Sequence, residues 1–217
     1  MVTVEQLANM IDHTNLKAFA DDAAFEKLCD EAKKYNFKMV AINPAQTVRC
    51  KKKLEGSPVH VGAAIGFPLG QTTLECKIFE TKDAIANGAD EIDMVMNIGA
   101  LKDKNYDLVR DDVKAVVEAA NGTLVKVILE TCLLTEDEIK KACELCVEAK
   151  ADYVKTSTGF STRGATIEDV RIMKEAVHGK AKVKAAGGVR TPEDMVKIVA
   201  AGADRIGTSA GCSLVKK

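Results

Sequence analysis

The 217-residue chain contains no tryptophan, only four prolines and three histidines, and aromatic residues make up just 4% of it. It also lacks any apolar run near the roughly 20 residues that a transmembrane helix requires. Its first six residues, Met-Val-Thr-Val-Glu-Gln, have neither the basic region nor the apolar region of a signal peptide. The sequence therefore predicts a cytoplasmic protein that does not act in a membrane.

An excess of charge of either sign is missing as well. The chain has 31 Lys and Arg residues against 32 Asp and Glu residues, interspersed along its length, for a formal net charge of −1. Nucleic-acid surfaces and polybasic membrane anchors need clustered basic residues, so we expect neither partner. A homodimer or homotetramer stays open, because the sequence does not separate exposed apolar residues from core ones.

Seven cysteines in a chain without an export signal indicate reduced thiols. Cys143 and Cys146 form a CxxC pair, but it lies well inside a helical pattern that begins near Thr135. A redox pair needs the helix N-terminus, where the dipole lowers the thiol pKa. No second CxxC or Cys/His pair completes a zinc site. We therefore expect both cysteines to pack in the core and not to bind a metal.

Short apolar runs alternate with longer amphipathic segments along the chain. The expected strands are Met10–Asp12, Lys38–Asn43, Val59–Ile65, Glu91–Met96, Val125–Glu130, Asp152–Thr156, Lys182–Ala186 and Arg205–Gly207. The expected helices include Asp22–Tyr35, Leu74–Asn87, Asp107–Ala120, Glu136–Ala149, Ile167–Val177 and Pro192–Ala200. This rhythm indicates parallel β/α units. Eight strands in a chain of this length favour an α/β protein of one domain, residues 1–217, folded as a (β/α)8 TIM barrel.

Two lysines interrupt strand-like runs where a solvated lysine does not belong. Lys155 and Lys184 lie in the sixth and seventh expected strands, which are neighbours, and strand alternation points both into the barrel. A buried ammonium must lose its proton, find a partner or open onto a wet pocket. A neutral amine attacks carbonyls, and a second cation helps to keep it neutral. The pair predicts Schiff-base chemistry; the alternative is that both lysines extend from strand ends into solvent.

Two further charged residues fall on the neighbouring strands. Asp93 lies in the fourth expected strand and Lys126 in the fifth. In a parallel barrel, catalytic groups gather at the C-terminal ends of the strands, so we expect Asp93 to approach the two lysines. Asp93 by itself could also be an ordinary ion-pairing or capping carboxylate, and we expect Lys126 to support it as an ion-pair partner.

Glycine-rich loops follow the last two strands. Gly187 and Gly188 come directly after the seventh strand, and the segment from Gly207 to Ser209 comes at the end of the eighth. Glycine admits a ligand close to the backbone, and these two loops form the recurrent phosphate site of such barrels. Gly159, after Lys155, adds a further donor. Tight turns also use paired glycines, but two glycine loops in these places predict phosphate binding.

Taken together, these segments resemble the deoxyribose-phosphate aldolase family. The matching stretches are Asp12-His13-Thr14, residues 63–70, residues 91–95, residues 126–131, residues 153–160 and residues 183–190. The resemblance covers nearly the whole chain, and the stretches around the two lysines carry most of its specificity.

The resemblance implies a class I aldolase without metal or cofactor. Such an enzyme interconverts 2-deoxy-D-ribose 5-phosphate with acetaldehyde and D-glyceraldehyde 3-phosphate, in the catabolism of deoxyribose phosphates. By this likeness Lys155 is the Schiff-base lysine, Lys184 lowers its pKa, and Asp93 relays protons. Supporting roles fall to Lys126 and Asp12, and the phosphate contacts are Gly159, Gly187, Gly188, Gly207 and Ser209.

Two positions depart from the family pattern. Some members carry a lysine where Phe160 stands here, which removes one cation from the phosphate side. Some carry a cysteine in the second strand where this chain has Ala41. Other functions stay open: a transaldolase or another Schiff-base sugar-phosphate aldolase, a non-catalytic barrel that only binds sugar phosphates, or a scaffold with a large exposed apolar face.

Overall fold

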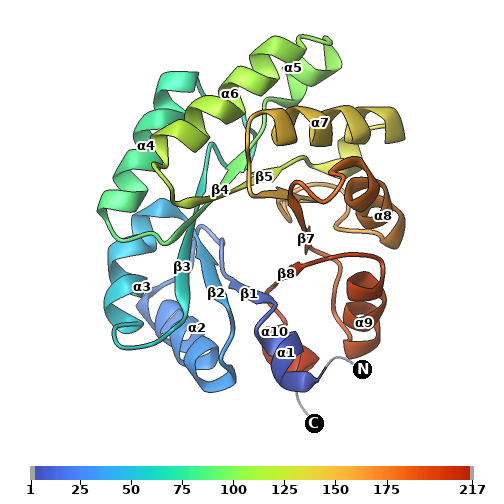
Figure 1. Cartoon of the computed structure of the whole chain (residues 1–217). Coiled ribbons are helices and arrows are strands. Elements are labelled where there is room, and N and C mark those ends of the chain that lie inside the picture. Colours follow the sequence, from blue (N-terminus) through green and yellow to red (C-terminus); the bar gives the residue numbers. More distant parts are fainter. Residues whose placement is uncertain (1–2, 216–217) are drawn as a thin grey trace.

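Eight parallel strands close into a barrel in which each strand pairs with its neighbours in chain order, and helices surround it (Figure 1). The computed structural model describes residues 3–215, so the first two and last two residues of the predicted domain 1–217 lie outside it. The strands are β1 (Ile11–Thr14), β2 (Met39–Ile42), β3 (His60–Ile65), β4 (Glu91–Val95), β5 (Leu124–Ile128), β6 (Tyr153–Lys155), β7 (Lys182–Ala186) and β8 (Arg205–Thr208). The predicted TIM barrel is confirmed.

All six predicted helices form. They are α2 (Asp22–Tyr35), α4 (Leu74–Ala86), α6 (Tyr106–Ala119), α7 (Glu136–Glu148), α8 (Ile167–Ala176) and α9 (Pro192–Ala200). The patterns did not predict α1 (Val4–Ala8), α3 (Thr47–Lys53), α5 (Ile98–Lys102), α10 (Gly211–Leu214) and two 3-10 turns, Pro44–Gln46 and Thr131–Leu133. These elements are too short to show a helical period. None of the helices described is both long and apolar enough to cross a bilayer.

Seven of the eight strands differ from their predicted bounds by one or two residues at an end, and β1 and β5 differ most. β1 starts one residue later than expected and continues to Thr14, pairing with both β2 and β8. β5 ends at Ile128 instead of Glu130, because Glu130 has a left-handed backbone with φ of 56° and turns the chain out of the sheet. Its carboxylate then accepts a hydrogen bond from the backbone N–H of Thr158 at 3.2 Å.

One joint recurs three times around the barrel. An aspartate just before an even-numbered strand accepts a hydrogen bond from a valine N–H of the preceding strand at 2.8–2.9 Å: Asp90, Asp152 and Asp204. Two residues earlier the backbone φ is positive, at Gly88 (101°), Lys150 (63°) and Gly202 (118°). Lys150 therefore takes a positive φ at the position that glycine fills in the other two joints.

The apolar core lies between the strands and the helices. Outward-facing strand residues such as Val40, Ile92 and Val127 are fully buried against the helical layer. Cys143 and Cys146 belong to the same layer on α7. Burial raises the pKa of Cys146 to about 12 and that of Cys143 well above its ordinary value, so both thiols stay protonated. This geometry matches the predicted packing role of the pair.

A buried ion pair fastens α4 to α6. Lys77 is fully buried, and its Nζ lies 2.5 Å from Oδ2 of Asp112 and 3.1 Å from the carbonyl oxygen of Val95. Burial raises the pKa of Asp112, and the charge of Lys77 opposes that rise. Removing the lysine alone would leave a buried carboxylate without its cation.

We predict that Lys77→Met lowers the free energy of unfolding by about 3–5 kcal/mol in urea denaturation. The double variant Lys77→Met/Asp112→Leu should recover most of that loss, because neither charge is then left unpaired. Lys82→Met, on the exposed face of the same helix, is the matched control and should change stability by less than about 0.5 kcal/mol. Equal stability of the two single variants would contradict the role given to this ion pair.

Candidate active site

The inside of the barrel is charged, in contrast to its apolar outer layer. Among the described residues, strand alternation directs inward seven charged side chains that are at most 5% exposed: Asp12, Glu91, Asp93, Lys126, Lys155, Lys184 and Arg205. Parallel pairing sets them side by side, since Asp93 is level with Lys126 and Lys155 with Lys184. Together they form one network that joins six strands, β1 and β4 to β8.

Asp93 is the centre of this network. Its Oδ2 accepts hydrogen bonds from Nζ of Lys155 and Nζ of Lys184, each at 2.7 Å, and its Oδ1 accepts one from Nζ of Lys126 at 2.9 Å. Burial by itself would raise the pKa of Asp93, but the three lysine charges outweigh burial and hold that pKa well below its usual range. Asp93 is therefore an ionised carboxylate shared by three amines.

Two more carboxylates extend the network toward the N-terminal ends of the strands. Lys126 also lies 2.5 Å from Oε2 of Glu91, and Lys184 lies 2.5 Å from Oδ2 of Asp12 at an angle unsuited to a hydrogen bond. Arg205 connects the two branches, because its Nη2 is 2.6 Å from Asp12 and 3.1 Å from Glu91. Burial by itself would raise the pKa of Glu91, but the charges of Lys126 and Arg205 outweigh burial and lower that pKa to about 2.

The charges inside the barrel balance only if one lysine is neutral. Three carboxylates face four cationic side chains, so a neutral Lys155 leaves Lys126, Lys184 and Arg205 to match them. Burial lowers the pKa of Lys155 to about 8; Asp93 opposes this shift, and the charge of Lys184 adds to it. The sequence analysis attributed the low pKa of Lys155 mainly to Lys184, whereas in the structure burial is the larger cause.

A cavity of about 520 Å³ opens above Lys155 at the C-terminal end of the strands. Its lining includes Thr14, Lys17, Thr158, Gly159, Phe160, Gly187, Gly188, Arg190, Gly207, Thr208 and Ser209. Lys184 is fully buried and is not part of this lining. Of the two amines bound to Oδ2 of Asp93, Lys155 is thus the one that a ligand can reach.

Glycine is needed on the β7 and β8 side of the cavity. Gly187 and Gly188 have φ values of 73° and 82°, in the left-handed region that side chains disfavour. A Cβ on Gly207 would lie 3.2 Å from Cε of Lys184, so glycine leaves room for the lysine stem beneath β8. Two exposed cations, Lys17 and Arg190, stand at the same side of the cavity. This side therefore combines close backbone approach with positive charge.

The residues selected from the sequence fall into two groups in space. Asp12, Asp93, Lys126, Lys155 and Lys184 form the buried network. The five expected phosphate contacts, Gly159, Gly187, Gly188, Gly207 and Ser209, all line the cavity above it. Lys155 belongs to both groups, because it pairs with Asp93 in the network and also lines the cavity.

Comparison with known proteins identifies the family. Residues 7–216 match the DeoC/LacD family aldolases. The chain belongs to this aldolase family. It is 59% identical to the deoxyribose-phosphate aldolase of Clostridium perfringens over 211 residues, covering 97% of this chain and 94% of that protein. It is 58% identical to that of Lysinibacillus sphaericus over 212 residues, covering 97% and 95%.

A solved structure agrees with these sequence matches. The tetrameric deoxyribose phosphate aldolase from Aeropyrum pernix superposes with a TM-score of 0.93 at 34% identity, covering 99% of this chain and 92% of the other. The similarity therefore spans the barrel and not only the stretches around the two lysines.

The sequence analysis missed several members of this aldolase's site. Glu91 and Arg205 complete the charge network, and Lys17 and Arg190 add cations at the cavity rim. The sequence could have indicated Glu91, because it lies two residues before Asp93 and therefore on the same strand face. Lys17 and Arg190 carried no such signal, since exposed basic residues in loops are common.

Phe160 and Ala41, the two departures from the family pattern, occupy different surroundings. Phe160 lines the cavity, is 57% exposed and meets the ring of Phe67 edge-on, with centroids 5.3 Å apart. Ala41 is buried on β2. The first substitution thus makes part of the cavity rim aromatic, whereas the second changes an interior position.

The protonation of Lys155 gives a direct test of the network. Its amine should react with an acylating reagent above a midpoint near pH 8, and peptide mapping of the labelled protein gives that midpoint. Asp93→Asn should move the midpoint down, because it removes a charge that favours the ammonium. Lys184→Met should move it up, because it removes a repelling cation. Shifts of the same sign in both variants would contradict this assignment.

Proposed function

We propose that this aldolase reversibly cleaves 2-deoxy-D-ribose 5-phosphate to acetaldehyde and D-glyceraldehyde 3-phosphate through a Schiff base on Lys155. The observation that carries the proposal is a buried amine with a pKa of about 8 at the floor of a cavity. The curated relatives described above are named for this substrate class. An amine of ordinary pKa would be almost entirely protonated near neutral pH and unreactive toward an aldehyde.

The reaction follows from the chemistry of that amine. Neutral Lys155 adds through Nζ to the C1 aldehyde of the open-chain sugar, and loss of water gives an iminium. The iminium draws the electron pair of the C2–C3 bond while a base removes the proton of the C3 hydroxyl. Glyceraldehyde 3-phosphate leaves, and the enamine of acetaldehyde on Lys155 is protonated and hydrolysed. No step requires a metal or a cofactor.

We assign proton handling to Asp93 and Lys184. Iminium formation places a fixed positive charge beside Asp93, which stabilises it as a carboxylate 2.7 Å from the same nitrogen. Lys184 donates to the same Oδ2 at 2.7 Å, so a proton can pass between the two amines through this carboxylate. Asp93 itself is a weak base, because its pKa is held low. It therefore acts as a bridge for protons, with water reaching it through the cavity.

The β7 and β8 side of the cavity is assigned to the phosphate. Gly187, Gly188 and Gly207 allow the ligand to approach the backbone, and Ser209 adds a hydroxyl. Arg190 lies next to these loops at the rim and supplies charge. The distance between this side and Lys155 would then select a short sugar chain, which favours the five-carbon substrate over the longer sugars of transaldolases.

The proposal also covers how the chain assembles and where in the cell it acts. The Aeropyrum pernix relative is tetrameric, and we propose that this chain also forms a homo-oligomer. We place it in the cytoplasm, where its cysteines would stay reduced and deoxyribose phosphates are consumed. Light scattering during size-exclusion chromatography would measure the assembly directly.

Trapping the imine tests the central step. Borohydride reduction in the presence of acetaldehyde should add a stable ethyl group to the peptide that carries Lys155. Lys155→Ala should lose both the adduct and turnover, whereas Lys180→Ala, at an exposed lysine, should keep both. Binding of glyceraldehyde 3-phosphate without any adduct would instead support a non-catalytic sugar-phosphate barrel. Faster cleavage of longer sugars would favour a transaldolase-like enzyme.

Phe160 tests the phosphate side. Phe160→Lys adds a cation to the cavity rim and should lower KM for 2-deoxyribose 5-phosphate several-fold at low salt, with little effect on unphosphorylated 2-deoxyribose. Phe79→Lys adds the same charge at an exposed position on α4 outside the cavity lining, and should leave both values unchanged. An equal effect on both sugars would place the phosphate elsewhere.

A further inference from the structure

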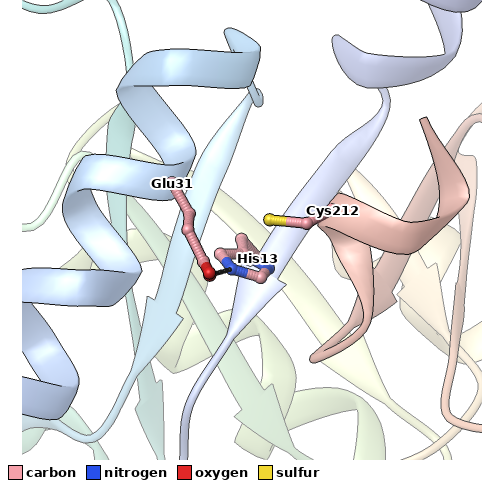
Figure 2. Close-up of side chains that lie close together, drawn as sticks. All are labelled: His13, Glu31 and Cys212. Atoms are coloured by element: carbon pink, nitrogen blue, oxygen red, sulfur yellow. Dashed lines mark hydrogen bonds and ion pairs between the residues drawn. The ribbon is translucent and has the colours of Figure 1, made fainter. Parts of the chain in front are cut away.

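A second group of chemically active side chains lies on the outside of the barrel wall. His13 on β1, Glu31 on α2 and Cys212 on α10 come together there, and Figure 2 shows the Glu31 carboxylate and the Cys212 sulfur approaching the imidazole from opposite helices. One ligand atom from each of the three lies within 4.8 Å of the other two. Strand alternation points Asp12 into the barrel and His13 out of it, so this group is separate from the lysine network.

The imidazole of His13 is held in place but only half satisfied. Its Nε2 lies 2.7 Å from Oε2 of Glu31, and its ring packs against Phe37 with centroids 5.1 Å apart. Only 3% of His13 is exposed, yet its Nδ1 is buried without a hydrogen-bond partner among the described residues. That nitrogen lies at the start of α10, where a Cβ on Gly211 would be 2.9 Å from it. A buried ring nitrogen without a partner costs free energy unless something binds it.

We propose that this group binds a thiophilic divalent metal ion such as Zn²⁺. Nδ1 of His13 and Sγ of Cys212 are the direct ligands, and Glu31 holds the ring through its bond to Nε2. A carboxylate behind a histidine ligand is the usual arrangement in zinc proteins, where it fixes the tautomer that leaves the other nitrogen free to bind. Zinc bonds of about 2.0–2.3 Å to nitrogen and sulfur are compatible with the observed spacing after small side-chain rotations.

Charge and access favour this occupant. Glu31 and a Cys212 thiolate together carry two negative charges, which match one divalent ion. Among the described residues, the charged partner of Glu31 besides His13 is Lys27, at 3.8 Å and 75% exposed, so this lysine neutralises little of the carboxylate charge. Its side chain is 29% exposed and Cys212 is half-buried, so an ion can enter and water can fill the remaining positions. Bound metal would tie β1, α2 and α10 together.

Cobalt provides a spectroscopic test on the full chain. Titration of chelator-treated protein with Co²⁺ should produce a thiolate-to-cobalt charge-transfer band in the near ultraviolet, and Zn²⁺ should remove it by competition. Cys212→Ser should abolish the band, and Glu31→Gln should weaken binding by about 10–100-fold. Cys76→Ser and Cys132→Ser, which alter the exposed and half-buried cysteines of other surfaces, should bind as the unaltered chain does.

A second measurement avoids reliance on the folding of variants. Peptide mapping after brief iodoacetamide treatment should show that Zn²⁺ protects Cys212 in the unaltered chain and leaves Cys76 equally reactive. The proposal is overturned if Co²⁺ gives no thiolate band, if the band survives in Cys212→Ser, or if Zn²⁺ fails to protect Cys212. Because neither readout involves turnover, these outcomes are independent of the aldolase assignment.

Discussion

The carboxylate of Asp93 is the group on which the interior of this barrel depends. Three lysine amines from three other strands converge on its two oxygens at 2.7–2.9 Å. Without that anion, Lys126 and Lys184 would be cations in a space with almost no solvent, and burial of that kind costs several kcal/mol for each ion. Asp93 therefore fixes the position of the lysines and also sets how many protons they hold together.

The network explains why one lysine differs from the others. Within residues 3–215, Lys126 and Lys184 each pair with two carboxylates, whereas Lys155 pairs with Asp93 alone. Burial lowers the pKa of Lys126, but the charges of Asp93 and Glu91 outweigh burial and raise that pKa above its ordinary value. Lys155 has the fewest anions near it and is the one open to the cavity. The amine proposed to react thus differs from the other two in its access to the cavity and in its smaller number of carboxylate partners.

The barrel architecture separates stability from chemistry. Apolar residues on the outward strand faces and on the helices form the core, and the charged residues lie inside the barrel. The two sets of residues share strands but point in opposite directions. Because side chains alternate along a strand, one short segment contributes to the apolar core and also to the charged interior. The cavity lies at the C-terminal mouth, where glycine loops expose backbone in place of side chains. The His13 group shows that the outward faces are not wholly inert, since β1 carries polar residues on both sides.

The sequence by itself determined the strand-and-helix rhythm, the eight-stranded barrel, the two lysines and the glycine loops, because periodicity and local turn chemistry are properties of short segments. It did not reveal Glu91 and Arg205 as partners of the site, or the approach of Glu31 and Cys212 to His13, because these contacts join residues far apart in the chain. Tertiary structure also decided which lysine lines the cavity and why its pKa is low. Solvent exposure and the number of nearby carboxylates follow from packing, and in this chain packing, more than the neighbouring lysine, lowers the pKa of Lys155.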